Sequence, residues 1–195
     1  MAEMNLSVTT RRRYDGVTLS LHWLTAAGVL FLFASAHIWE WLERGTPLRK
    51  GLQAVHISCG ILLTVIVIVR LAWRFSGRRA PSREATSPAA RFLAGSVHAA
   101  LYLLLAAQIV LGFLFRWAQH EPFTFFGIID LTGWFNVDPA IKHSLATWHN
   151  GVAWAIIALV FMHALAALAH HYLLKDNTLR RMMPGRAFTG DGQQK

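Results

Sequence analysis

Four long apolar stretches separated by shorter polar segments dominate the pattern of this chain. They run near Leu19–Trp39, Leu52–Trp73, Phe92–Phe115 and Leu145–Tyr172. The only formally charged residue inside them is Arg70. Each stretch is long enough to cross a lipid bilayer as a helix, which takes about 20 residues. Because the apolar runs are continuous rather than alternating, they predict an all-α integral membrane protein, a bundle of four transmembrane helices, and not a barrel.

The segments between the stretches hold the residues that interrupt helices. The third connection, residues 116–144, is the longest and is rich in aromatic side chains. Such side chains gather at membrane–water interfaces, so we expect this loop to lie along the membrane surface. The pattern divides the chain into an N-terminal segment, residues 1–18, a transmembrane domain, residues 19–174, and a C-terminal tail, residues 175–195.

Composition and charge agree with a membrane protein. The chain is 54% hydrophobic and 15% charged, whereas about a quarter of the residues of a soluble domain are charged. The net charge of +9 would also suit a nucleic-acid partner. However, fourteen of the 19 Lys and Arg residues lie in the N-terminal segment, in and beside the second connection, and in the tail. The positive-inside rule therefore predicts that both termini are cytoplasmic, and we expect no binding of nucleic acid.

The first apolar stretch has an alternative interpretation as a cleaved signal peptide. Three arginines precede it at positions 11–13, and Ala34-Ser35-Ala36 has the small-x-small pattern of a cleavage site. The stretch is long for that role and has His22 near its start. We therefore favour an uncleaved span.

Histidines inside the predicted helices are the candidate functional residues, because ionisable groups within a membrane are costly and usually mark function. His149 and His163 are fourteen residues apart in the fourth helix. This is close to four turns, so they share a face and lie about 21 Å apart along the axis. Two ligands so placed suit two haems stacked across the bilayer. They do not suit a single metal ion, whose ligands must converge, and this disfavours the alternative of a histidine-lined metal-ion transporter.

Depth in the membrane predicts the partner of each histidine. His22 lies in the first turn of a helix that starts at the cytoplasmic side, which is the depth of His163. His56 lies near the start of a helix that enters from outside, which is the depth of His149. The pairs His22/His163 and His56/His149 would each give a haem iron two axial nitrogens and no open position. Such ligation favours electron transfer over oxygen binding.

Two other histidines, His37 and His98, lie at similar depths and could compete as ligands. A porphyrin beside a helix requires a small side chain four residues from its ligand, on the same face. Small residues follow all four predicted ligands at this spacing, as Ala26, Gly60, Ala153 and Ala167. His37 is instead followed by Trp41, and His98 by Tyr102.

Further candidates lie near the two ends of the helices. His170 is seven residues after the last predicted ligand, on the same face, where it could hydrogen-bond or protonate a quinone; a histidine facing water is the alternative. Arg70 and Arg74 lie where the propionates of the inner haem would end, and a guanidinium suits a carboxylate. Positive-inside anchors are the alternative for these arginines. Arg116 and Lys142 are their counterparts at the outer end.

Several motifs resemble the bacterial cytochrome b561 family. They are Leu21-His22-Trp23, the run from Val55 to Gly60, Trp148-His149 and the segment from His163 to Pro184. The resemblance covers residues 14–184 and implies a four-helix bundle with two b haems in a bacterial inner membrane. The implied ligands are the residues matching His22, His56, His149 and His163, which agrees with the pairs derived from depth.

The resemblance also implies electron exchange with ubiquinone. The chain is similar to members of the family that act as superoxide oxidases, in which the position matching His170 is associated with the quinone. The leading hypothesis is therefore a di-haem quinone oxidoreductase. A one-electron donor, possibly superoxide, would reduce the outer haem, and ubiquinone would accept the electron beside the inner one. The alternative is a cytochrome b anchor subunit that connects a periplasmic dehydrogenase or hydrogenase to the quinone pool, with the long third loop as its docking surface.

Overall fold

The structure, a computed structural model, describes residues 14–76, 87–176 and 178–183. Some residues used above lie outside the described residues, namely the arginines at positions 11–13, 78, 79 and 83, and Pro184. Four helices in the described part of the chain are long and apolar enough to cross a membrane. The prediction of an all-α, multi-pass membrane protein is confirmed.

The four helices coincide with the four apolar stretches. They are α1, Gly16–Ile38, α2, Pro47–Phe75, α3, Pro88–Gln119, and α4, Lys142–Tyr172. A short 3₁₀ helix, η1, Trp39–Trp41, follows α1 directly. The second and third helices extend beyond their predicted spans at both ends, and the fourth at its start.

Capping residues explain where three of these helices begin. The carboxylate of Asp15 accepts a hydrogen bond from the backbone N–H of Thr18 at 2.9 Å. Thr46 and Ser87 cap α2 and α3, and a proline follows each of them. Such side chains satisfy N–H groups that the first turn leaves unpaired, and proline suits the first helical position. The caps therefore place the starts of α2 and α3 several residues before their apolar stretches.

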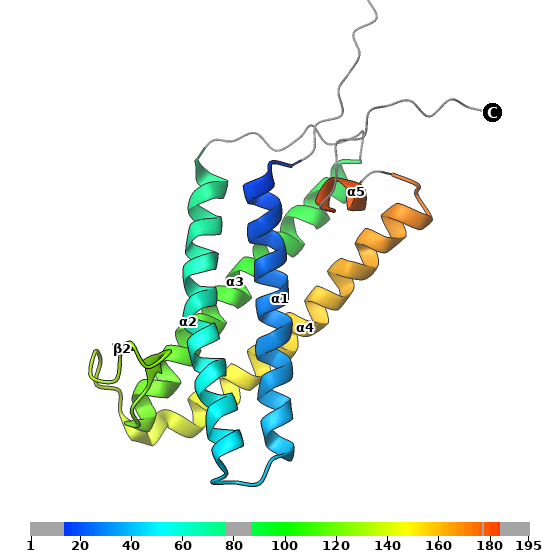
Figure 1. The fold of residues 1–195 in the computed structure, drawn as a ribbon. Helices are drawn as coiled ribbons and strands as arrows, with labels where there is room; N and C mark the ends of the chain where they lie inside the picture. The colour runs from blue at the N-terminus through cyan, green and yellow to red at the C-terminus, as the bar shows by residue number, and fades with distance from the viewer. Residues whose placement is uncertain (1–13, 77–86, 177, 184–195) are drawn as a thin grey trace, which may run out of the picture.

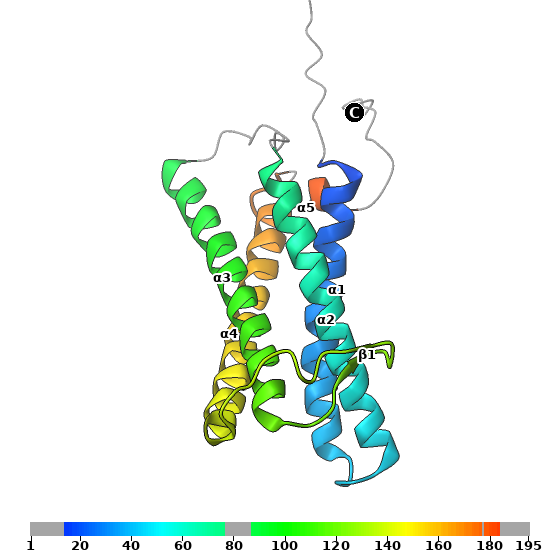
Figure 2. The ribbon, with the colours of Figure 1, turned by 90° about the vertical axis from the view of Figure 1, so that its left-hand side faces the viewer.

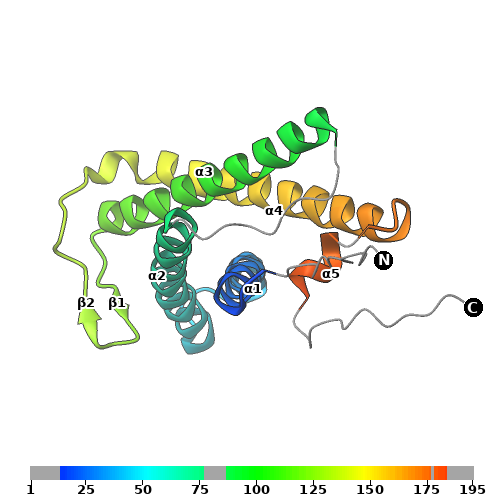
Figure 3. The same ribbon diagram turned by 90° about the horizontal axis from the view of Figure 1, so that it is seen from above.

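The helices form two antiparallel pairs that face each other. α1 packs along α2, and α3 packs along α4, whereas contact between α2 and α3 is much less extensive. Figure 2 shows the two pairs as separate layers, and Figure 3 shows the same arrangement from above. We call α1 with α2 the first hairpin and α3 with α4 the second hairpin. The buried core lies where they meet, at Leu63, Val67, Leu105 and Ile156.

The bundle has two distinct ends. α1 and α3 begin at one end, where α2 and α4 finish, and we call it the terminal end (Figure 1). The connections after α1 and after α3 lie at the other end, which we call the loop end. Many large apolar side chains along the helices are exposed, among them Phe92 and Leu103. A lipid-facing surface has this composition, since a bilayer solvates apolar groups.

The third connection folds into a small hairpin, which the sequence did not predict. Strands β1, Thr124–Phe125, and β2, Ile129–Asp130, pair in antiparallel fashion. The turn has positive φ at Phe126 and Gly127, a conformation typical of two-residue hairpin turns. Ser58 of α2 holds the hairpin, because its Oγ accepts from the N–H of Phe126 at 2.9 Å. A second short 3₁₀ helix, η2, Pro139–Ile141, then leads into α4.

The chain folds back at the terminal end after α4. Helix α5, Thr178–Met182, lies between the ends of α1 and α4 (Figure 1). The indole N–H of Trp23 donates to the carbonyl of Met182 at 2.7 Å. The described part of the tail is therefore docked onto the bundle.

Candidate functional site

A large cavity lies between the two hairpins in the loop-end half of the bundle. Its volume is about 810 Å³, within the range of roughly 300–1,000 Å³ that is usual for cofactor sites. His56 of α2 and His149 of α4 both line it. Gly60 and Ala153, the small residues four positions after these two histidines, line it as well. The structure thus brings together one of the two predicted histidine pairs around a space suited to a large planar group.

His56 is held from the first hairpin. Its Nδ1 lies 2.9 Å from Oγ of Ser35, a side chain of α1 that is only 2% exposed. Oγ of Ser35 also donates to the carbonyl of Leu32 at 3.0 Å. The ring of Trp39 packs edge-on against the imidazole, with 4.9 Å between the centroids. These contacts fix the ring within the cavity wall.

His149 is held from the second hairpin and lacks some hydrogen bonds. Its Nε2 lies 3.2 Å from Nε2 of Gln108, while Nδ1 of His149 and Oε1 of Gln108 are buried without a partner among the described residues. Buried polar atoms are nearly always paired, because leaving one unpaired costs free energy. The ring lies against Gly112, where a Cβ would come within 3.2 Å of Cε1. An imidazole with unmet bonding capacity beside a large cavity fits a metal-bearing cofactor.

The other predicted pair meets at the terminal end. The ring centroids of His22 and His163 are 6.5 Å apart. Two imidazoles that share one metal need roughly 6 Å between centroids, since each metal–nitrogen bond is about 2 Å. Arg70 donates from Nη2 to Nδ1 of His22 at 2.9 Å. The separation fits a shared metal, and a cation occupies the hydrogen-bonding position behind one ligand.

A third histidine joins this pair. The ring of His98 lies 5.3 Å from that of His163, and its Nδ1 is 2.6 Å from the carbonyl oxygen of Ala94. The test of small residues excluded His98 because Tyr102 follows it by one turn. Tyr102 instead faces two arginines, with Arg70 and Arg74 lying 5.3 and 5.6 Å from its ring centroid. His98 is therefore close enough to remain a rival of His22.

His37, the rival at the loop end, also lines the cavity. Its Nδ1 lies 2.9 Å from the carbonyl oxygen of Phe33. The rings of Phe33 and Trp154 pack against it, with centroids 4.3 and 5.4 Å away. These three aromatic side chains connect α1 and α4 beside the cavity.

His170 pairs with an acidic residue that the sequence did not single out. Its Nδ1 lies 2.5 Å from Oδ2 of Asp176, and the N–H of Asp176 donates to the carbonyl of His170 at 3.0 Å. Burial of Asp176 raises the pKa of its carboxyl, but hydrogen bonds from His170 and Thr178 outweigh this effect and hold the pKa below its ordinary value. The chain reversal after α4 creates this pair, so helical spacing alone could not have predicted it.

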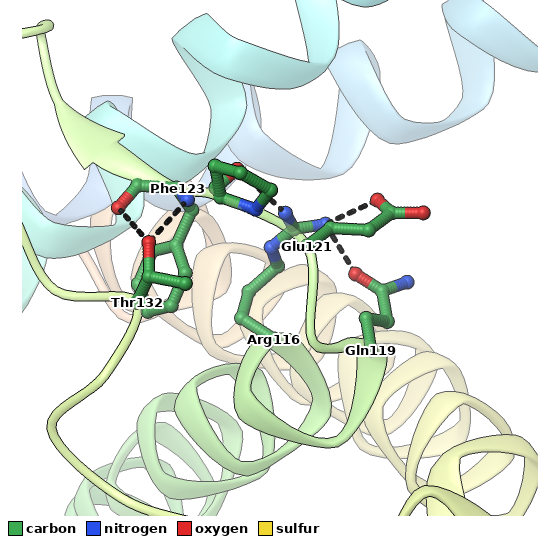
Figure 4. A network of polar contacts seen from close by, with 6 residues as sticks. Arg116, Gln119, Glu121, Phe123 and Thr132 are labelled. Atoms are coloured by element: carbon green, nitrogen blue, oxygen red, sulfur yellow. Dashed lines mark hydrogen bonds and ion pairs between the residues drawn. The ribbon is translucent and has the colours of Figure 1, made fainter.

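A polar network surrounds Arg116 near the loop-end mouth of the cavity (Figure 4). Nη1 of Arg116 donates to Oε1 of Gln119 and lies 3.6 Å from a carboxylate oxygen of Glu121. Its guanidinium is above the ring of Phe123, and its Nε is buried without a partner among the residues described here. Arg116, Gln119, Glu121 and Phe123 all line the cavity. The cavity that the histidines line therefore also has a guanidinium whose Nε could still donate to a carboxylate.

The fold and the site together define a class of protein. It is a multi-pass helical membrane protein in which imidazoles from different helices line one cavity at the loop end and lie close together at the terminal end. In the described ranges, no three or more His, Cys, Asp or Glu side chains are grouped so that they could hold a metal ion. The rings of His22 and His163, with centroids 6.5 Å apart, are spaced as two ligands of one metal would be.

Comparison with known proteins identifies the family. The family model described as prokaryotic cytochrome b561 matches residues 13–185. The chain belongs to this family of membrane cytochromes, which bind b-type haem and transfer electrons. The resemblance found in the sequence motifs is thereby confirmed.

Named relatives cover nearly the whole chain. Cytochrome b561 homolog 2 of Escherichia coli (strain K12) is 32% identical over 89% of this chain and 93% of its own length. The probable superoxide oxidase CybB of Yersinia pestis is 30% identical over 89% and 97%, respectively. A probable Ni/Fe-hydrogenase 1 B-type cytochrome subunit of Escherichia coli (strain K12) is 22% identical over 95% and 94%.

Proposed function

We propose that the chain binds two b haems, one in each half of the bundle. His56 and His149 hold the haem in the loop-end cavity, and His22 and His163 hold the other at the terminal end. The observation that carries the proposal is the presence of two histidine pairs at opposite ends, one lining a cavity of about 810 Å³ and one with ring centroids 6.5 Å apart. Each haem, when bound, can take up and release one electron.

Charged side chains in each half complete the two sites. Arg116 supports a propionate at the loop end, because its buried Nε lacks a partner among the described residues. Arg70 and Arg74 serve the same purpose at the terminal end. An imidazole that ligates iron through Nε2 carries its proton on Nδ1, and a guanidinium cannot accept that proton. Haem binding by His22 at the terminal end therefore requires Arg70 to release Nδ1 of His22.

We place ubiquinone at the terminal end, beside His170. Asp176 accepts the Nδ1–H of His170 and so leaves Nε2 available to a quinone oxygen. Electrons would pass from a one-electron donor at the loop end to this quinone. Superoxide is a candidate donor, which the similarity to a probable superoxide oxidase supports. The distribution of Lys and Arg supports an inner-membrane location with cytoplasmic termini.

Haem content tests the proposal most directly. Purified, detergent-solubilised protein should show the absorption bands of a b-type cytochrome, and pyridine haemochrome analysis should return two haems per chain. A single haem would overturn the relay between the two halves, and none would overturn the whole proposal.

The donor needs a separate experiment. The protein should be reconstituted in vesicles that contain ubiquinone, and superoxide should be generated outside the vesicles. We expect the ubiquinone to be reduced, and superoxide to be consumed faster than by its uncatalysed dismutation. The His56→Leu variant is the matched control, because it removes one ligand of the loop-end haem. Equal rates in the wild type and this variant would exclude superoxide as the donor.

An anchor subunit for a peripheral dehydrogenase or hydrogenase is the second candidate. The similarity to a hydrogenase cytochrome subunit supports it. So do exposed apolar side chains on the third connection, where Ile128, Trp134 and Phe135 are each at least 61% exposed. Co-purification with a peripheral redox enzyme would favour this function. Full activity of the isolated chain with a soluble donor would count against it.

A further inference from the structure

Ser35 is a buried hydroxyl of α1 with two hydrogen-bonding neighbours. Its Oγ lies 3.0 Å from the carbonyl oxygen of Leu32 and 2.9 Å from Nδ1 of His56, and the residue is only 2% exposed. Hydroxyls in membrane helices often bond only to a carbonyl of the preceding turn. Ser35 goes further, because it connects α1 to a side chain of α2.

The chemistry of the three groups determines which of them donates. The carbonyl of Leu32 can only accept, and Oγ of Ser35 donates to it at 3.0 Å. With that hydrogen engaged, Oγ of Ser35 offers its lone pairs to His56. The His56 ring also approaches the backbone of Leu32, so both oxygens near Nδ1 favour a hydrogen on that nitrogen. In a neutral imidazole the other nitrogen, Nε2, then has the free lone pair that a metal requires.

We propose that Ser35 is a positioning residue for the loop-end haem. It holds His56 in the tautomer that ligates through Nε2, and it fixes the ring in the cavity wall. A partner that accepts the remote N–H also makes an imidazole a more basic ligand. A more basic ligand favours ferric over ferrous iron, so Ser35 lowers the midpoint potential of this haem. The inference rests on the proposed role of His56 as a ligand.

The other ligands have different surroundings, so the effect should be confined to one haem. Nδ1 of His149 is buried with no partner in the described part of the chain. Nδ1 of His22 faces the guanidinium of Arg70, which can donate but cannot accept. Of His22, His56 and His149, His56 is thus the one whose Nδ1 lies against a buried hydroxyl.

The test compares Ser35→Ala with a matched control, Thr25→Ala. Thr25 is a buried hydroxyl on the same helix, 3% exposed, but it donates to the carbonyl of Leu21 at 2.6 Å and lies at the terminal end. We expect Ser35→Ala to retain two haems per chain, as measured by haemochrome analysis. Spectroelectrochemical titration should show that one midpoint potential has shifted upward. The same titration of Thr25→Ala should leave the loop-end potential unchanged.

Two further variants show whether the shift in midpoint potential belongs to the loop-end haem and depends on the acceptor at position 35. Ser35→Cys keeps a weaker acceptor, so its shift should have the same sign and be smaller. The shift should persist when Ser35→Ala is combined with His163→Leu, which removes the terminal-end haem and leaves the loop-end haem to be titrated alone. If Ser35→Ala loses only the loop-end haem and Ser35→Cys recovers it, the positioning role is also supported.

Other outcomes overturn the inference. Unchanged potentials in a two-haem Ser35→Ala protein would do so while leaving the proposed function intact. So would equal shifts of both haems, or a loss of haem that Ser35→Cys does not recover. A wild-type protein without haem would instead overturn the proposed function, and the role of Ser35 with it.

Discussion

The two ends of the bundle present the same ligand type in different surroundings. At the loop end, His56 and His149 line a cavity and are held by neutral side chains, Ser35 and Gln108. At the terminal end, His22 and His163 lie close together beside the guanidinium of Arg70. The loop-end histidines thus have neutral hydrogen-bonding neighbours, although Arg116 also lines their cavity, whereas His22 at the terminal end has a guanidinium within hydrogen-bond distance.

This difference bears on the direction of electron flow. A nearby cation favours the reduced state of a haem, because reduction lowers the charge of the iron by one. A hydrogen-bond acceptor behind a ligand favours the oxidised state. With a haem bound at each end as proposed, Arg70 would therefore raise the potential at the terminal end, and Ser35 would lower it at the loop end. Electrons should run downhill from the loop end to the terminal end, toward the proposed quinone.

Removing single ligands should have the largest effect on this comparison. His56→Leu and His149→Leu should each abolish only the loop-end haem, and His22→Leu and His163→Leu only the terminal-end haem, because leucine cannot ligate iron. Haem content should fall from two to one per chain in every variant, with a different residual potential for each end. If any single variant lost both haems in a folded protein, the two ends would not be independent sites.

A variant of His98 tests which histidine is the partner of His163 at the terminal end. It lies nearer to His163 than His22 does, with 5.3 against 6.5 Å between ring centroids. We expect His98→Leu to retain two haems, because the 6.5 Å separation suits a shared iron and the shorter one is tight. Retention of two haems by His22→Leu, with loss of one in His98→Leu, would reassign the pair to His98 and His163.

Filling the loop-end cavity should remove its haem without altering a ligand. A Cβ at Gly60 would meet nothing within 4 Å, and the residue lines the cavity. Gly60→Leu would project into that space and should weaken haem retention at least about tenfold, which corresponds to roughly 1.4 kcal/mol. Gly151→Leu is the matched control, since Gly151 is an exposed helical residue whose Cβ also meets nothing. Equal haem loss in both variants would show that Gly60 acts through helix packing and not through the cavity.

The contrast between the ends also shows how far the sequence could predict the structure. Continuous apolar runs defined all four helices, because a bilayer imposes helical structure on each run separately. The spacing of His149 and His163 likewise depends on one helix alone. Contacts across helices were missed, among them Ser35 with His56, because they require the rotation of each helix and the rotamer of each side chain. The hairpin on Ser58 depends in addition on a turn with positive φ at Phe126.

A smaller effect should follow from changing the charge at the terminal end. Arg70→Gln removes a cation that donates to Nδ1 of His22. A unit charge about 8 Å from the iron contributes about 2 kcal/mol at an effective dielectric constant near 20, so the terminal-end potential should fall correspondingly. Arg49→Gln is a suitable control, because the guanidinium of Arg49 donates to the carbonyls of Trp39 and Leu42 at the loop end. A fall in the loop-end potential in Arg70→Gln would contradict the proposed division between the ends.

The smallest effect concerns the docked tail at the terminal end and its dependence on pH. The folded state holds the pKa of Asp176 below its ordinary value through hydrogen bonds from His170 and Thr178, against the opposing effect of burial. Because the carboxyl pKa is lower in the docked state, the ionised carboxylate stabilises the docked tail at pH values above its unfolded-state pKa of about 3.9. This stabilisation is lost as the pH falls through the pKa of the folded state. Hydrogen exchange of residues 173–176 and 178–183 should therefore accelerate on acidification in the wild type. In Asp176→Asn the exchange of the tail should already be fast at pH 7 and should accelerate little on acidification. Exchange of the loop-end hairpin, residues 124–130, is the control and should be the same in both proteins. Acid acceleration of equal size in the variant would show that another group controls the docking of the tail.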